Sequence, residues 1–127
     1  MISLEHFTNN FVYVPDIKDS WRILKPIDGM YFGDCEDFSL TYLFLHCNES
    51  YLKFWTALFF GDARINYCVL PSGDGHAVLS IKDMYIDNIT REFVTKNKLV
   101  DNGYVFHWEY FSAFQVARKL LETKLRG

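Results

Sequence analysis

The 127-residue sequence has few of the features that mark disulfide-rich, metal-clustered or nucleic-acid-binding proteins. It contains only three prolines and three cysteines, and it lacks the paired CxxC spacing typical of zinc sites. Its Lys and Arg residues are scattered and its formal net charge is −3, whereas a nucleic-acid surface needs concentrated positive charge. We therefore expect no disulfide framework and no nucleic-acid partner.

Long apolar runs, repeats and low-complexity segments are also missing. No run approaches the roughly 20 apolar residues of a membrane span. The first residues, Met1 to His6, lack the basic segment followed by an apolar stretch that marks a secretory signal. We therefore expect one ordered domain over residues 1–127, with no membrane span and no export signal.

Apolar residues are plentiful: half of the chain is hydrophobic and 18% is aromatic, enough for a sizeable core. The first thirty residues predict irregular chain with one short helix. Helical spacing and capping residues then predict helices over about 34–46, with Asp34 as N-cap, and over about 50–60, between Ser50 and Gly61. Tyr51, Phe54, Trp55, Leu58, Phe59 and Phe60 form an aromatic cluster that we expect to be mostly core.

After Gly61 the hydrophobic pattern changes to the alternation typical of strands. It predicts strands over 65–70, 76–81 and 84–89 in an antiparallel meander, a further strand near 103–108 and a helix over about 110–124. The predicted class is α+β, with the helices packed on one antiparallel sheet.

The segment Gly33-Asp34-Cys35-Glu36-Asp37-Phe38 carries the strongest chemical signal. With Asp34 as N-cap, Cys35 is the first helical residue, where the free amides and the positive end of the helix dipole favour a thiolate. The Cys35 backbone amide is also placed to stabilise an oxyanion on a carbonyl that the sulfur attacks. We predict that Cys35 is a nucleophile.

A histidine and an aspartate follow the cysteine at His76 and Asp87. A two-residue turn at Lys82-Asp83 pairs Val78 with Asp87, which makes His76 and Asp87 diagonal neighbours on one face of the hairpin. This register predicts that Asp87 orients the imidazole, and we expect that face to meet the Cys35 helix. Cys35, His76 and Asp87 thus form a predicted catalytic triad.

Three motifs in this order resemble the bacterial transglutaminase-like cysteine proteinases of the papain-like superfamily, most of all their short phage- or prophage-encoded members. They are Gly33-Asp34-Cys35-Glu36-Asp37-Phe38, Gly75-His76-Ala77-Val78-Leu79 and Ile86-Asp87-Asn88. The resemblance implies a papain-like or transglutaminase-like core and a thioester-forming enzyme acting on a protein or peptide.

The resemblance also implies secondary roles for other residues. Trp21 matches an upstream tryptophan that helps to line the oxyanion site, and Asp34 and Glu36 match positions that can hold calcium. No other cofactor is implied. The expected location is the cytoplasm or a virion. The family members that cut adhesins at the cell surface are longer and exported, so their substrates do not carry over.

Two alternatives remain open from the residues alone. Peptidase, deamidase and transglutaminase share this triad and differ only in the acyl acceptor. A catalytically silent phage-type protein would instead keep the fold and bind a partner through exposed aromatic side chains.

Overall fold

The computed structural model describes residues 4–15 and 20–126, apart from the side chains of residues 107–109. In chain order its elements are α1 (Leu4–Asn9), β1 (Phe11–Tyr13), β2 (Tyr31–Gly33), α2 (Cys35–His46), α3 (Tyr51–Phe59), β3 (Ala63–Val69), β4 (Gly75–Ile81), β5 (Met84–Ile86), α4 (Lys96–Asp101), β6 (Val105–Phe111) and α5 (Ala113–Arg126). The predicted α+β class is confirmed.

The main sheet has the strand order β5-β4-β3-β6 and is antiparallel throughout. The predicted meander is therefore confirmed for β3, β4 and β5, and β6 pairs with the other edge of β3. β5 ends at Ile86, three residues before the predicted strand end, because the chain turns at Asp87. That turn brings Asp87 back toward β4.

Two features were not predicted. β1 and β2 form a parallel pair, with Phe11 opposite Tyr31, and each strand has only three residues. Helix α4 follows the turn after β5, and its N-cap Thr95 accepts the Lys98 amide at 3.3 Å. Both features are too short for a periodic hydrophobic pattern to stand out.

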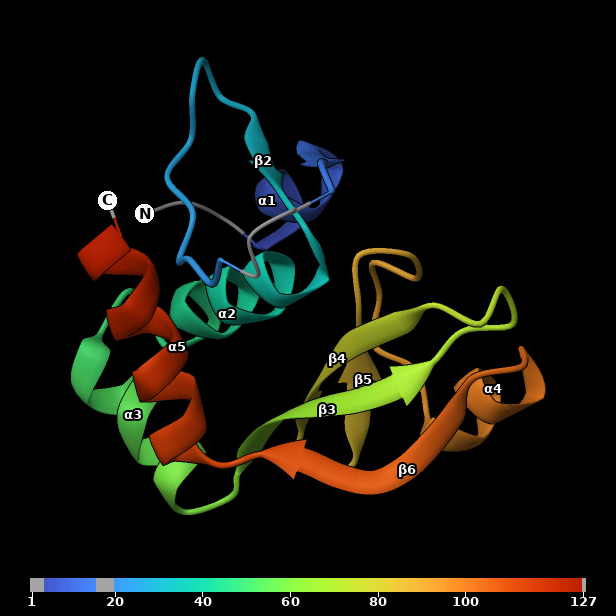
Figure 1. Cartoon of the computed structure of the whole chain (residues 1–127). Helices are drawn as coiled ribbons and strands as arrows, with labels where there is room; N and C mark the ends of the chain where they lie inside the picture. The colour runs from blue at the N-terminus through green and yellow to red at the C-terminus, as the bar shows by residue number, and fades with distance from the viewer. Residues whose placement is uncertain (1–3, 16–19, 127) are drawn as a thin grey trace.

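Helix α2 is the centre of the fold. Figure 1 shows α1, α2 and the β1–β2 pair on one side of the sheet, with α3 and α5 together at one end and α4 at the other. Phe38 and Leu43 of α2 belong to the same buried cluster as Ala77 and Leu79 of β4. The expectation that the His76 face meets this helix is therefore wrong. His76 alternates with Ala77 and shares the opposite face with Val78, which packs in a second cluster with Tyr104.

The aromatic cluster around α3 is more exposed than predicted. Phe54 and Leu58 are buried, but Tyr51 is 59% exposed and Phe60 is 79% exposed. The helix is short and packs one face on α2, and rings on its other sides, such as Phe59 against Phe114 of α5, are covered on one side only. The prediction that most of this cluster is core is wrong.

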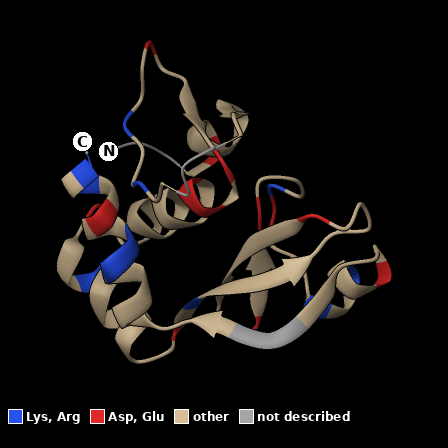
Figure 2. Cartoon of the chain, viewed as in Figure 1, with Lys and Arg blue, Asp and Glu red and all other residues tan. Residues whose placement is uncertain are grey.

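Charged residues are unevenly spread. Figure 2 shows basic residues along α5 and acidic residues around the start of α2. No helix in the described ranges combines the length and apolar character needed to cross a membrane.

Candidate active site

Cys35 is the first residue of α2, as predicted. The N-cap Asp34 accepts the Asp37 amide on Oδ1 at 3.1 Å, and the Asp34 amide donates to Asp37 Oδ2 at 3.2 Å. This reciprocal capping box fixes the first turn of the helix. The position of the thiol is therefore set by local sequence.

Gly33 is required by the close approach of Asp37. A Cβ added at Gly33 would lie 2.8 Å from both Cβ and Oδ2 of Asp37. The second Asp37 oxygen, Oδ1, accepts the Arg22 amide at 2.8 Å, which ties the segment before β2 to the helix. Gly33 and Asp37 thus hold the chain on both sides of Cys35.

His76 and Asp87 form the pair that the hairpin register predicts. The pairs Leu79↔Ile86 and Ile81↔Met84 confirm the two-residue turn at Lys82-Asp83. His76 Nε2 lies 2.7 Å from Asp87 Oδ2, and both side chains are buried. This contact leaves Nδ1 as the ring nitrogen available for a proton from substrate or thiol.

Tyr104 and Thr90 complete the surroundings of Asp87, and neither was predicted. The Tyr104 hydroxyl donates to Asp87 Oδ2 at 2.6 Å, while the Thr90 amide and hydroxyl donate to Oδ1 at 2.7 and 2.8 Å. Burial alone raises the pKa of Asp87, but the bonds from His76, Tyr104 and Thr90 outweigh it and lower that pKa to about 2. Asp87 is therefore ionised and holds the Nε2–H tautomer of His76. Asp87 Oδ1 also accepts the Ile89 amide at 3.2 Å, two residues on, which is the spacing of an Asx turn. This local pattern was visible in the sequence.

Cys35 lies near His76 and Asp87 because its sulfur contacts the backbone of the neighbouring residue Ala77. Pairing between β4 and β5 stops at Leu79 and Ile86, which leaves that edge of β4 open beside Ala77. The Ala77 amide donates to Cys35 Sγ at 3.4 Å, so the sulfur lies next to the residue that follows His76. Among the described residues, no hydrogen bond joins Sγ to the His76 ring. The structure brings the three predicted residues into one region with His76 and Asp87 in direct contact.

The thiol donates instead to Glu36 Oε2 at 3.2 Å. Burial, and then the charge of Glu36, raise the pKa of Cys35 above its ordinary value. Burial and the charge of Asp34 likewise raise the pKa of Glu36 to about 7 and that of Asp37 to about 7. In this arrangement Cys35 is a protonated thiol, so the thiolate expected from the helix dipole alone is not the resting state.

A cleft of about 280 Å³ opens beside Glu36 and His76. Its walls include the rings of Trp21, Tyr67 and Phe111, and Trp21 packs edge-on against Phe111 with ring centroids 4.9 Å apart. Trp21 therefore lies in the wall of this cleft; its predicted role at an oxyanion stays a prediction. The backbone amide of Cys35, at the first helical position, has no partner carbonyl within the helix.

Gly75 begins β4 at the edge of the same cleft. A Cβ at Gly75 would lie 3.0 Å from the Tyr67 hydroxyl oxygen. The absence of a side chain at this position lets the Tyr67 ring approach the strand that carries His76. The glycine of the second motif thus shapes one wall of the cleft.

The calcium prediction stays a prediction. Asp34 Oδ1 and both Asp37 oxygens already accept backbone amides, and Glu36 Oε2 accepts the thiol. Across residues 4–15 and 20–126 no three His, Cys, Asp or Glu side chains are grouped to hold a metal ion. Calcium prefers six to eight oxygen ligands, and Asp34 and Glu36 would supply only a few. The chemistry proposed below uses no metal.

The remaining cysteines are buried and are not joined to one another. Cys47 and Cys68 are free thiols, and Cys68 lies opposite His76 in the register of β3 and β4. Burial raises the pKa of Cys68 to about 12. Both thiols are therefore internal references for the reactivity of Cys35.

Comparison with protein-family profiles, with curated proteins and with solved structures found no match.

Proposed function

We propose that the chain is a thiol-dependent acyl-transfer enzyme, a cysteine peptidase or amidase that acts through a thioester on Cys35. The observation that carries this proposal is the buried pair of His76 and Asp87, 2.7 Å apart, beside a cysteine at a helix N-terminus. The resemblance to bacterial transglutaminase-like cysteine proteinases, with a papain-like core, supports the same assignment and is part of the proposal.

The first step is proton transfer from the thiol. For this transfer the Cys35 thiol has to turn from Glu36 toward the His76 ring, whose Nδ1 takes the proton; Glu36 and His76 line the same cleft. Asp87 stabilises the imidazolium that forms, because its carboxylate is ionised and already accepts Nε2–H. The thiolate then attacks the carbonyl carbon of an amide, and the Cys35 backbone amide faces the oxyanion.

Collapse of the tetrahedral intermediate completes the first half of the reaction. His76 returns the proton to the leaving amine, the carbon–nitrogen bond breaks, and a thioester remains on Cys35. In the second half, water attacks the thioester while His76 takes one of its protons. The carbon–sulfur bond then breaks, and the proton passes to Sγ, which regenerates the thiol.

Transglutaminase and deamidase activities use the same steps with a different acceptor or substrate. An amine that replaces water gives a new amide, and attack on a glutamine side chain releases ammonia. The residues around Cys35 and His76 serve all three reactions equally. The acyl acceptor therefore has to be determined on acylated protein.

Acylation by p-nitrophenyl acetate tests the proposal without knowledge of the substrate. We expect a burst of nitrophenolate and an acetyl thioester located on Cys35 by peptide mass spectrometry. Cys35→Ala and His76→Ala should abolish the burst, while Cys47→Ala, the matched removal of a buried thiol, should retain it. Equal acetylation of all three cysteines, or a burst unaffected by His76→Ala, would show that the proposal is wrong.

A second candidate is a catalytically silent binding protein with the same fold. It is favoured by the hydrogen bond from the Cys35 thiol to Glu36 and by the exposed rings of Tyr51 and Phe60 on and beside α3. This candidate predicts no acetylation of Cys35. It also predicts a partner whose binding survives Cys35→Ala and His76→Ala.

A further inference from the structure

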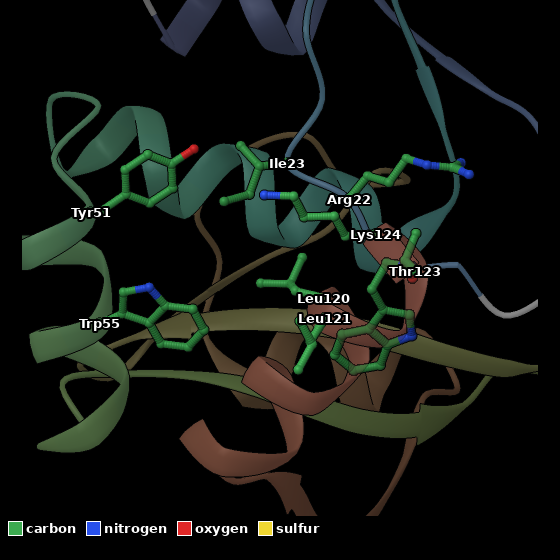
Figure 3. A pocket seen from close by; sticks show the side chains of 9 residues that line it. Arg22, Ile23, Tyr51, Trp55, Leu120, Leu121, Thr123 and Lys124 are labelled. Carbon is green, nitrogen blue, oxygen red and sulfur yellow. The ribbon is translucent and has the colours of Figure 1, made fainter. Parts of the chain in front are cut away.

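A second and larger hollow lies behind the wall of the cleft. It is a groove of about 710 Å³ between α3, α5 and the segment 21–23. Figure 3 shows Trp55 of α3 facing Leu120 and Leu121 of α5 across it, with Ile23 near the top. The walls are therefore largely apolar, and Leu121 is 57% exposed there.

The charged side chains that line the groove are both cations. Its nine lining residues include Arg22 and Lys124 but no Asp or Glu, in a chain whose net charge is −3. In Figure 3 the Lys124 amine extends toward Ile23 and the hydroxyl of Tyr51, while the Arg22 guanidinium points away from Trp55. The groove is thus a cationic apolar surface on an acidic protein, which favours a ligand with apolar and acidic groups.

Trp21 belongs to both hollows. It lines the groove together with Thr123, and it lines the cleft together with Glu36 and His76. The Trp21 amide donates to Thr123 Oγ1 at 2.8 Å, and the next amide, of Arg22, is held by Asp37. The wall between the two sites is therefore fixed to α5 and to α2, and the groove is preformed.

We propose that this groove binds a part of a peptide substrate that lies beyond the Trp21 wall from the scissile bond, and that this part carries an apolar side chain and a carboxylate. The apolar side chain lies between Trp55 and Leu121, and the carboxylate accepts from Lys124 and Tyr51. The assignment as a substrate groove rests on the proposed function, because the groove matters to catalysis only if Cys35 reacts.

Selection from a random peptide library displayed on its own messenger RNA tests the groove directly. Cys35→Ala protein serves as bait, so that bound peptides are not turned over. We expect enriched peptides to combine Leu, Phe or Trp with Asp or Glu. Lys124→Glu should bind a selected acidic peptide about tenfold more weakly in fluorescence anisotropy, because an attraction becomes a repulsion.

The control is Lys98→Glu, which makes the same charge change on the exposed face of α4, at the far end of the sheet from the groove. It should leave the affinity for the selected peptide unchanged. An enriched pool without acidic residues, or equal losses in Lys124→Glu and Lys98→Glu, would overturn the proposal. So would a dimer, measured by light scattering, that dissociates on Leu121→Glu, since a second copy would then fill the groove.

The outcomes separate this inference from the proposed function. If Cys35 is acetylated but no acidic peptide binds in a way that depends on Lys124, the proposed role of the groove is wrong and the enzyme assignment still holds. Peptide binding by a protein whose Cys35 cannot be acetylated overturns the role in substrate binding and supports the silent binding protein.

Discussion

The Tyr104 hydroxyl lies 2.6 Å from Asp87 Oδ2, the same oxygen that lies 2.7 Å from His76 Nε2. Tyr104 comes from the segment before β6 and reaches the hairpin only in the folded chain. It packs edge-on against His76, with ring centroids 5.8 Å apart. Tyr104 therefore helps to hold Asp87 in place against the imidazole.

Tyr104→Phe removes this donor and keeps the ring. We expect a folded protein in which the pKa of Asp87 rises, because one of the bonds that lower it is lost. The acetylation burst should slow about tenfold, in line with loss of one hydrogen bond to a charged group. The measurement is the pH profile of the burst rate. We expect the fall in rate on the acidic side of the profile to begin at a higher pH than in wild type.

Tyr85→Phe is a matched control for Tyr104→Phe, since Tyr85 packs against the same cluster and its hydroxyl is not among the described donors to Asp87. It should leave the profile unchanged. If Tyr104→Phe keeps the wild-type pH profile of the burst rate, the Tyr104 hydroxyl has no effect on Asp87 that matters to the reaction.

Glu36→Gln should make Cys35 more reactive toward iodoacetamide. Glu36 accepts a hydrogen bond from the Cys35 thiol, and its charge raises the pKa of Cys35. The neutral amide removes that charge, so the pKa of Cys35 falls and more thiolate is present at a given pH. Timed alkylation read by peptide mass spectrometry compares Cys35 with the buried Cys47.

The control for Glu36→Gln is Glu92→Gln, which neutralises an exposed carboxylate distant from the thiol in sequence. It should not change the labelling rate. Slower labelling of Cys35 in Glu36→Gln would instead make Glu36 an activating base.

Stability should fall as the pH rises from about 5 to about 8. The pKa values of Glu36 and Asp37 are each raised to about 7 by burial and by the charge of Asp34, whereas an unfolded carboxyl titrates near its ordinary value. The folded state therefore binds more protons, and the stability present below the unfolded pKa is lost as the pH passes about 7. Urea denaturation at the two pH values measures this as a lower midpoint at the higher pH.

Glu36→Gln removes one of the two groups and should reduce the pH dependence of the midpoint. Asp87 acts with the opposite sign, because its pKa is lowered to about 2, but it changes stability only in acid below its ordinary pKa. A wild-type midpoint that rises toward pH 8 would contradict the raised pKa values.

Gly33→Ala should destabilise the fold by about 2 kcal/mol, the cost typical of forcing an extra carbon into a packed site. The added Cβ would lie 2.8 Å from Asp37 Cβ and Oδ2, which the capping box and the Arg22 amide hold in place. Gly75→Ala is the comparison, since its nearest neighbour is the terminal hydroxyl of Tyr67 at 3.0 Å. Thermal unfolding by circular dichroism should show the larger loss for Gly33→Ala.

Equal melting temperatures for wild type and Gly33→Ala would mean that Asp37 has another position available. In that case the hydrogen bond from the Arg22 amide to Asp37 would not be needed to hold the segment before β2.

Local sequence determined the parts of the site that depend on neighbours along the chain. The Asp34 cap places Cys35 at the start of α2, and the two-residue turn at Lys82-Asp83 places His76 beside Asp87. Capping and hairpin register act over a few residues, so their patterns can be read without the fold.

Tertiary structure decided what those residues meet. It turned the Ala77 face of β4, rather than the His76 face, toward α2, and it left Tyr51 exposed. It brought Tyr104 to Asp87, and it placed the half-buried Cys35 beside Glu36, which raises the pKa of the thiol that the helix dipole alone would lower. These outcomes depend on burial and on contacts between distant segments, and no local pattern in the sequence encodes them.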